Sequence, residues 1–280
     1  MQKPLEAVCF HHHFYYFYIR QSRHGIMELL EYNMGEKVKA FSTKRGESGG
    51  NYAGFNITHY CGDSAEHIAQ CRELLCTRLG IEDSHLILPR QTHGNTTLVI
   101  DELFMSAARE EQSNLLQGID AIVTALPRTC IGVSTADCVP ILLHDDSKGV
   151  IAAIHAGWRG TVSRIAKECI TLMLNRFNCN TANIKAVIGP SIGCDAFEVG
   201  DEVYAAFKEG GFKMEKIAAR KEKWHIDLWE ANRLILKECG FAEENIEVCG
   251  VCTRTHCEEF FSARRLGINS GRIFNGIMLI

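Results

Sequence analysis

The stretch that decides the fold spans residues 131–160 and reads IGVSTADCVPILLHDDSKGVIAAIHAGWRG. It contains three short runs, residues 131–134, 140–143 and 150–154, that are rich in apolar side chains at successive positions. Such runs are typical of strands covered on both faces, because a strand with one face in water alternates apolar and polar residues. The stretch therefore predicts neighbouring buried strands.

Further elements lie on both sides of this stretch. Six more short apolar runs predict strands at residues 86–88, 97–100, 121–124, 186–188, 246–251 and 273–280. Amphipathic spacing and capping residues predict helices after Ser64 with a stop at Gly80, from Thr161 onward, over 200–209, and from Asp227 to a stop at Gly240. Together these elements predict an α/β or α+β fold, in which helices cover a mixed sheet.

Composition narrows the class of protein. The chain has 280 residues, 46% of them hydrophobic, and a formal net charge of −4. These values favour a soluble globular protein and remove the bulk electrostatic argument for nucleic-acid binding. The 13 Cys and 12 His point to reduced thiols and a metal site rather than to a disulfide scaffold, so we expect a cytoplasmic protein.

The N-terminal segment differs from the rest of the chain. Residues 9–19, CFHHHFYYFYI, are aromatic and apolar but too short to span a bilayer, and they lack the pattern of a signal peptide. No other window reaches spanning length, so no membrane partner is expected. From residue 27 onward there is no linker, repeat or low-complexity tract. We expect residues 1–26 to be a mobile extension and 27–280 to form one domain.

Three polar segments border the predicted strands: RQTHG at 90–94, STADC at 134–138 and HAGWRG at 155–160. Side chains at strand ends beside glycine loops can converge on one cleft. His93, Cys138 and His155 then form a candidate set of three ligands. Two imidazoles and a thiolate suit Zn²⁺, and three protein ligands leave a fourth position open, as in catalytic zinc sites. Spacing alone leaves open that these are ordinary hydrogen-bonded or core residues.

Seven motifs in these and later segments carry a resemblance to a known family. They are, in chain order, RQTHG, GIDAIVT, STADCVPILL, AAIHAGWRGT, IGPSIG, FEVG and FFSARR. With them the chain resembles the YfiH/YlmD family, once called the multicopper polyphenol oxidase or laccase-domain family, over residues 27–280. The resemblance implies a single-domain α-β-β-α sandwich with mixed sheets flanked by helices. It also implies that His93, Cys138 and His155 are metal ligands.

The resemblance further implies purine nucleoside chemistry. Its expected form is zinc-dependent phosphorolysis of adenosine, guanosine or inosine and methylthioadenosine, with adenosine deamination in the same pocket. Some bacterial relatives also resemble peptidoglycan-precursor editing factors. Two departures from the family pattern, Cys71-Arg72 for Asn-Arg and Ala263 within FFSARR for Tyr, concern the shape of the substrate pocket and leave the ligands unchanged.

Other residues have the chemistry that such reactions need. Zinc lowers the pKa of bound water to about 7, which suits attack on C6 of adenine. Phosphorolysis needs an anion site, and arginine forks suit phosphate. The arginine candidates are Arg72, Arg90, Arg159, Arg264 and Arg265. Asp137 is a candidate base or imidazole-orienting residue. Gln91 and Thr92 are candidates for contact with the base or ribose. We expect a nucleoside and phosphate as partners, and a monomer or weak homo-oligomer.

The same residues are also compatible with other functions and other sites. Cys138 activated by His155 would make a metal-free cysteine hydrolase, although His93 has no role in it. A copper oxidase is disfavoured, because several coppers need more histidines at H-x-H spacing than the chain offers beyond residues 11–13. Cys249-x2-Cys252 with His256-Cys257 is a second candidate metal site, for which a buried strand and loop are the better explanation. Trp158 and the glycine loop at 189–193 are further candidates, for stacking a purine and binding an anion.

Overall fold

The structure is a computed structural model, and it describes residues 27–47 and 49–280. The strands are β1 Leu29–Tyr32, β2 Val38–Thr43, β3 Leu86–Ile87, β4 Thr97–Ile100, β5 Ala121–Thr124, β6 Cys130–Thr135, β7 Val139–Asp145, β8 Val150–Ala156, β9 Ile184–Ile188, β10 Glu198–Val199, β11 Ala218–Arg220, β12 Trp224–Ile226, β13 Ile246–Val248 and β14 Ile273–Leu279. The α-helices are α1 Ala65–Leu79, α2 Glu102–Ser106, α3 Arg109–Leu115, α4 Trp158–Val162, α5 Ile165–Phe177, α6 Asp201–Glu209, α7 Met214–Ile217, α8 Leu228–Glu238 and α9 Ala263–Leu266.

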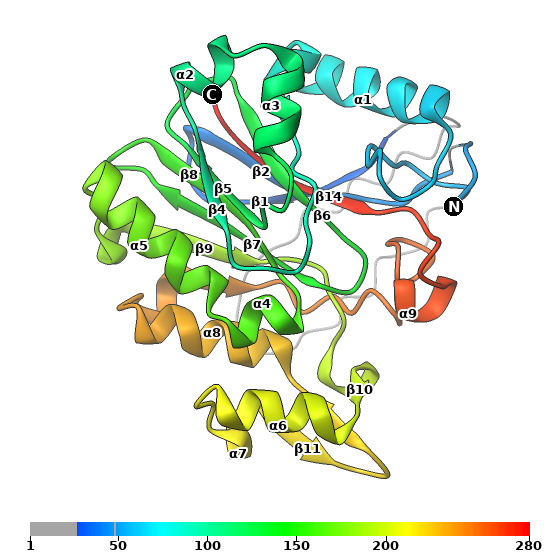
Figure 1. The fold of residues 1–280 in the computed structure, drawn as a ribbon, viewed down its shortest axis with the longest axis vertical. Helices are drawn as coiled ribbons and strands as arrows, with labels where there is room; N and C mark the ends of the chain where they lie inside the picture. Colours follow the sequence, from blue (N-terminus) through cyan, green and yellow to red (C-terminus); the bar gives the residue numbers. More distant parts are fainter. Residues whose placement is uncertain (1–26, 48) are drawn as a thin grey trace, which may run out of the picture.

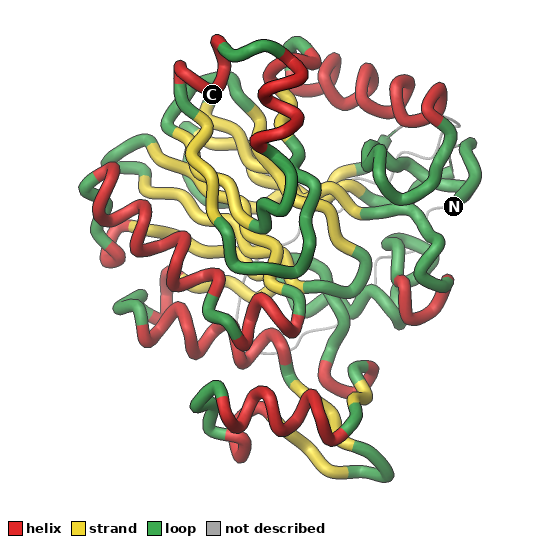
Figure 2. The backbone as a smooth tube through the Cα atoms, viewed as in Figure 1, coloured by secondary structure: helices red, strands yellow, loops and turns green. Residues whose placement is uncertain are grey.

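Two mixed sheets form the centre of the molecule (Figures 1 and 2). One has the strand order β1-β2-β14-β6-β3 and the other β13-β9-β7-β8-β5-β4. Their facing sides share one apolar cluster, to which β6 and β14 contribute Ile131 and Ile277, and β7 and β8 contribute Leu142 and Ile151. The nearly continuous burial of β5 to β8 agrees with the successive apolar residues of their sequences.

Helices cover the two outer faces. On the five-stranded sheet, Leu75 and Leu79 of α1 pack with Phe41 and Phe274. On the six-stranded sheet, helices α5 and α8 share the largest apolar cluster with β7, β8 and β9. The layer order is therefore helix, sheet, sheet, helix, which confirms the predicted fold class. Within the described residues, none of the helices is long and apolar enough to cross a bilayer.

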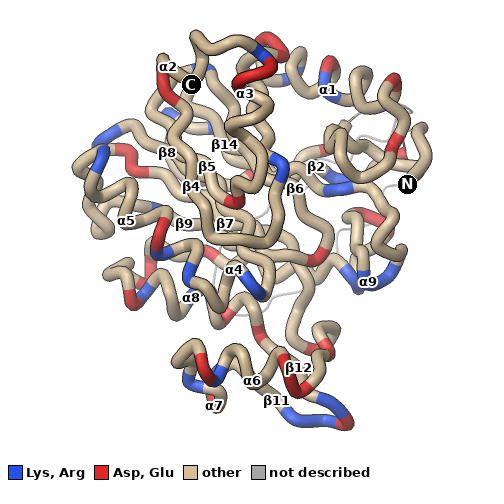
Figure 3. Tube along the Cα trace, in the orientation of Figure 1, with Lys and Arg blue, Asp and Glu red and all other residues tan. Residues whose placement is uncertain are grey.

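A smaller unit, of which the sequence predicted only the helix at 200–209, projects from one end of the molecule (Figure 1). It consists of the three-stranded sheet β10-β12-β11 with helices α6 and α7. Tyr204 and Trp224 stack at 3.9 Å between ring centroids, which ties α6 to β12. Basic and acidic residues are interspersed here and over the other residues that the structure describes (Figure 3). Lys221 and Lys223 pair with Asp195 and Glu198.

The first helix has its predicted boundaries. It begins after Ser64, whose side chain accepts a hydrogen bond from the His67 N–H, and ends at Gly80 with φ 68°. The helix predicted from Thr161 is instead split into α4 and α5, because Arg164 adopts a left-handed conformation with φ 63°. The strand predicted to reach residue 251 ends at Val248. The prediction of a mobile extension at 1–26 lies outside the described residues.

Candidate metal centre

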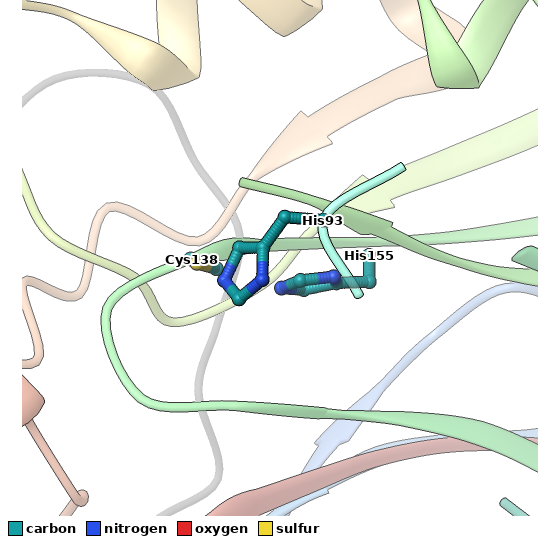
Figure 4. Close-up of side chains that lie close together, drawn as sticks. All are labelled: His93, Cys138 and His155. Carbon is teal, nitrogen blue, oxygen red and sulfur yellow. The ribbon is translucent and has the colours of Figure 1, made fainter. Parts of the chain in front are cut away.

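Three chain segments bring His93, Cys138 and His155 together. One ligand atom from each lies within 4.8 Å of the others, and their side chains point toward one another (Figure 4). Among the residues that the structure describes, this is the one group of three or more His, Cys, Asp or Glu side chains packed so closely. The four-residue candidate set Cys249, Cys252, His256 and Cys257 therefore does not form a second centre there.

Strand pairing explains the convergence. Strands β7 and β8 are antiparallel, and Val139 pairs with Ala156, so Cys138 at the start of β7 lies beside His155 at the end of β8. Strand β5 pairs with the other edge of β8, with Ala121 opposite Ile154, which places Asp120 next to His155. The sheet register thus builds most of the site, and the loop before β4 adds His93.

Asp120 is the residue that sequence reasoning missed. It is fully buried, and its carboxylate accepts a hydrogen bond of 2.7 Å from Nδ1 of His155. It also accepts from the backbone N–H groups of Thr92, His93 and Gly94 at 3.2, 3.0 and 2.8 Å. A carboxylate behind a ligand histidine is the common outer partner of metal sites. The available signal was an Asp directly before a buried strand, in GIDAIVT.

The electrostatics of the site favour an ionised thiolate. Burial alone would raise the pKa of the Cys138 thiol, but His155 and His93 lower it below its usual range. Burial alone would lower the pKa of His155, whereas the Cys138 thiolate and the Asp120 carboxylate raise it. Burial would raise the pKa of Asp120, which the hydrogen bond and charge of His155 and the loop N–H groups hold down. A thiolate is the form in which cysteine binds metals or acts as a nucleophile.

Gly157 lies against two of the three candidate ligands. A Cβ atom on Gly157 would lie 3.0 Å from Sγ of Cys138 and 3.1 Å from Cδ2 of His93, so a larger residue here would press on both side chains. Two imidazoles and a thiolate, with His155 buried and His93 exposed, and with the His155 imidazole hydrogen-bonded to a carboxylate, fit the donor set of a tetrahedral zinc ion with an open position. The residues present therefore fit a bound metal.

Asp137 is adjacent to Cys138 but faces elsewhere. Its carboxylate accepts hydrogen bonds of 2.6 Å from the Thr253 hydroxyl and from the backbone N–H of Arg264. With φ 87°, the residue turns its side chain toward these distant segments. These bonds support neither the predicted orienting role of Asp137 nor its predicted action as a base. The carboxylate that bonds to the His155 imidazole is that of Asp120.

The other predicted residues of the segments 90–94 and 155–160, together with Arg264, make different contacts. Gln91 exchanges two hydrogen bonds, 2.8 and 2.7 Å long, with the backbone of Ser134 and so holds its loop against β6. Thr92 contributes a backbone N–H to Asp120. The Arg159 guanidinium lies over the ring of Trp158, 4.2 Å from its centroid, at the start of α4. Arg264 donates to the carbonyl of Glu198 and lies over Phe197.

Arg72 and Arg90 line a pocket of about 540 Å³ between α1, β3 and α3. His59 and Arg109 also line it, and Asp83 is the carboxylate in its wall. Arg72 donates to Asp83 and to the carbonyl of Leu86, which fixes its side chain. Burial, Arg72 and Arg90 lower the pKa of His59, as expected where cations face one another. The pocket is therefore suited to an anion.

Comparisons with known proteins agree on one family. A family model described as multi-copper polyphenol oxidoreductase laccase matches residues 38–280. A purine nucleoside phosphorylase of Bacteroides thetaiotaomicron is 46% identical over 247 residues, which cover 86% of this chain and 92% of that protein. Adenosine deaminase RL5, from an unknown prokaryotic organism, is 48% identical over 247 residues, covering 86% of this chain and 94% of its own.

Solved structures share the fold. The hypothetical protein YfiH of Bacillus licheniformis superposes with a TM-score of 0.84 at 26% identity, covering 92% of this chain and 98% of that one. YlmD from Geobacillus stearothermophilus superposes with a TM-score of 0.80 at 28% identity, covering 87% and 92%. The layered sandwich is thus common to this chain and to both solved proteins.

Proposed function

Because the chain belongs to the multi-copper polyphenol oxidoreductase laccase family, which includes YfiH and YlmD, we propose that it is a purine nucleoside phosphorylase that also deaminates adenosine. The observation that carries the proposal is its identity of nearly one half, over 86% of the chain, to a purine nucleoside phosphorylase and to an adenosine deaminase. The nucleosides expected are adenosine, guanosine or inosine, and methylthioadenosine.

The catalytic centre of this proposal is a zinc ion held by His93, Cys138 and His155. Zinc supplies Lewis-acid activation of an oxygen atom and lowers the pKa of a bound water. Around it the chain's own residues orient the ligands: Asp120 holds His155, and Gly157 leaves space for the thiolate. Copper oxidase chemistry is disfavoured, since the described residues assemble a single cluster of three ligands.

Phosphate would bind in the pocket lined by Arg72, Arg90 and Arg109. Arg90 precedes the ligand His93 by three residues, and none of the described carboxylates pairs with its side chain. Arg72 is already oriented by Asp83 and Leu86, so its guanidinium is held in place before an anion arrives. The guanidinium fork suits phosphate oxygens. Arg159 and Trp158, which follow Gly157 at the start of α4, are proposed to contact the nucleoside.

A cysteine hydrolase is the second candidate function. The hydrogen bond from His155 to Asp120, together with the lowered pKa of the Cys138 thiol, gives a carboxylate, imidazole and thiolate in sequence. This arrangement would activate Cys138 without a metal. A role in editing peptidoglycan precursors is a further prediction that concerns the pathway rather than the site.

The cysteines indicate the cellular compartment in which the enzyme would act. Apart from Cys71, the cysteines in the described part of the chain are free thiols, as is usual in the reducing cytoplasm. We therefore propose a cytoplasmic enzyme that acts on small molecules as a monomer or weak homo-oligomer.

The deciding experiment incubates zinc-loaded protein with adenosine, with and without phosphate. Adenine and ribose 1-phosphate, formed only with phosphate, support phosphorolysis, and inosine supports deamination. Cys138→Ala should lose both zinc and activity, whereas the matched control Cys169→Ala, at a buried position of α5, should keep both. Absence of both products from a zinc-loaded wild type would contradict the purine assignment, and full activity of metal-free protein would favour the cysteine hydrolase mechanism.

A further inference from the structure

Asp120 lies between the two segments that carry the histidine ligands. Oδ1 accepts hydrogen bonds from Nδ1 of His155 and from the backbone N–H of His93. Oδ2 accepts from the backbone N–H groups of Thr92 and Gly94. Its own carbonyl accepts from the backbone N–H of His155 at 2.8 Å. One buried residue therefore connects the end of β8 to the loop that precedes β4.

The first consequence concerns the proton on His155. An ionised carboxylate only accepts hydrogen bonds, so the short bond to Asp120 requires a proton on Nδ1. The other ring nitrogen, Nε2, is then the atom left for a metal. The other tautomer of His155, with the proton on Nε2, would offer Asp120 no donor and would carry its proton on the side that faces the metal.

The second consequence concerns the backbone at His93. This residue has φ 64°, a left-handed conformation that non-glycine residues rarely adopt. Three successive N–H groups, of Thr92, His93 and Gly94, converge on the same carboxylate. Backbone N–H groups in this arrangement form a concave site for negative charge. The carboxylate therefore stabilises the turn that directs the His93 imidazole toward Cys138 and His155.

We propose that Asp120 is the positioning residue of the His93–Cys138–His155 centre, which fixes the ring nitrogen that His155 presents and the turn that carries His93, and thereby sets the affinity for zinc. The inference rests on the metal centre of the proposed function. It assigns to Asp120 no contact with substrate or with the metal.

Asp120→Asn isolates this role, because an amide has one acceptor and one donor end. If the amide nitrogen replaces Oδ2, it faces the N–H groups of Thr92 and Gly94, which lose their acceptor. If it replaces Oδ1, it faces the N–H of His93 and can pair with His155 only when Nδ1 has no proton, which moves that proton to the metal-binding side. Either orientation disturbs one of the two ligand segments.

The matched control is Asp145→Asn at the far end of β7. Asp145 is also fully buried, and its carboxylate accepts from the backbone N–H groups of Ser147, Lys148 and Asn180. It therefore reproduces the structural role of a buried carboxylate that binds loop N–H groups, with no ligand attached to it. Any loss of zinc affinity that is common to both variants would reflect general destabilisation.

The experiment measures zinc affinity by competition with a chromogenic chelator, at a temperature where circular dichroism shows all three proteins folded. We expect Asp120→Asn to bind zinc about 10- to 100-fold more weakly than wild type, and Asp145→Asn to bind it as wild type does. Equal affinity of wild type and Asp120→Asn would overturn the inference alone, as would an equal loss in both variants. A wild type that binds no zinc would overturn the proposed metal centre as well.

A second measurement needs no folded variant of Asp120. In zinc-loaded wild type labelled with ¹⁵N-histidine, the His155 signals, assigned by their loss in His155→Gln, should show a proton on Nδ1 coupled to that nitrogen and no proton on Nε2. A proton on Nε2, or an unprotonated Nδ1, would overturn the inference even if Asp120→Asn fails to fold.

Discussion

Gly157→Ala is expected to weaken metal binding while leaving the fold intact. Gly157 has φ −62° and ψ 170°, a conformation that alanine adopts without strain. The added Cβ would lie 3.0 Å from Sγ of Cys138 and 3.1 Å from Cδ2 of His93. Ordinary carbon contacts are about 3.5–4.0 Å, so the two side chains must retreat by roughly 0.5–1 Å.

The loss of zinc affinity depends on how much this displacement destabilises the metal-loaded protein relative to the metal-free protein. Without metal, the exposed His93 side chain can move, and the smaller entropy of the unfolded alanine chain offsets the strain by about 0.4–1 kcal/mol. With metal, the ligand distances must lie within about 0.2 Å of their ideal values. Overpacking of about 1–3 kcal/mol then affects the loaded state alone, which corresponds to zinc binding weaker by about 5- to 150-fold.

The assay is a chelator competition for zinc, combined with urea unfolding of the metal-free protein. Gly49→Ala is the matched control, because the nearest atom to its added Cβ is 3.9 Å away, an ordinary contact. We expect the free energy of unfolding of the metal-free Gly157→Ala protein to lie within about 1 kcal/mol of wild type. Wild-type zinc affinity in Gly157→Ala, or an equal loss in Gly49→Ala, would refute the reasoning.

Three further predictions test the surroundings of the centre. Arg90→Ala should raise the KM for phosphate about tenfold or more, with a smaller effect on kcat, whereas Arg233→Ala, which removes a surface ion pair, should change neither in the steady-state assay. Burial would raise the pKa of Asp145, but hydrogen bonds from Ser147 and the backbone lower it. The ionised Asp145 carboxylate therefore stabilises the fold above its unfolded pKa, and this stabilisation is lost as the pH falls below about 4. Urea unfolding should therefore show a shallower acid-induced loss of stability in Asp145→Asn than in wild type; equal slopes would contradict this. Asp137→Asn should lower the free energy of unfolding by about 1–3 kcal/mol, because asparagine tolerates the positive φ but weakens the hydrogen bonds to Thr253 and Arg264. Its zinc affinity, measured by the same chelator titration, should equal that of wild type. A large loss of zinc affinity would return Asp137 to the ligand-orienting role.

The fold could be predicted wherever local pattern and tertiary environment agree. Strands β4 and β5 match their predicted ranges, and every residue of β5 is buried, as its run of apolar residues predicts. Strand β2 was missed because its buried positions include Ser42 and Thr43, whose hydroxyls bond to other strands: Ser42 donates to Asn275, and Thr43 accepts from the Phe274 N–H. Such polar residues are buried by long-range partners that local sequence does not contain.

The site shows the same limit. The three ligands could be proposed because two imidazoles and a thiolate suit zinc. Spacing alone left ordinary hydrogen-bonded or core residues open, and the family motifs then pointed to the same three residues. Asp120 could not be assigned, since its partners lie 26 to 35 positions away along the chain. Asp137 was chosen for its place beside Cys138, yet its bonds reach Thr253 and Arg264, 116 and 127 positions away. Adjacency in sequence is a poor guide to which carboxylate supports a ligand.

His93 is the residue that distinguishes a metal centre from a cysteine hydrolase. Asp120, His155 and Cys138 would serve either mechanism, as orienting carboxylate, base or ligand, and thiolate. In a cysteine hydrolase His93 would only help to lower the pKa of the Cys138 thiol. The residue nevertheless adopts φ 64°, a strained conformation that costs about 1–3 kcal/mol and that three N–H groups on one carboxylate stabilise. A third ligand is what a catalytic zinc ion requires. The strain at His93 therefore favours the metal, because the strained turn directs a second imidazole toward Cys138 and His155, where a metal ion needs it as a ligand.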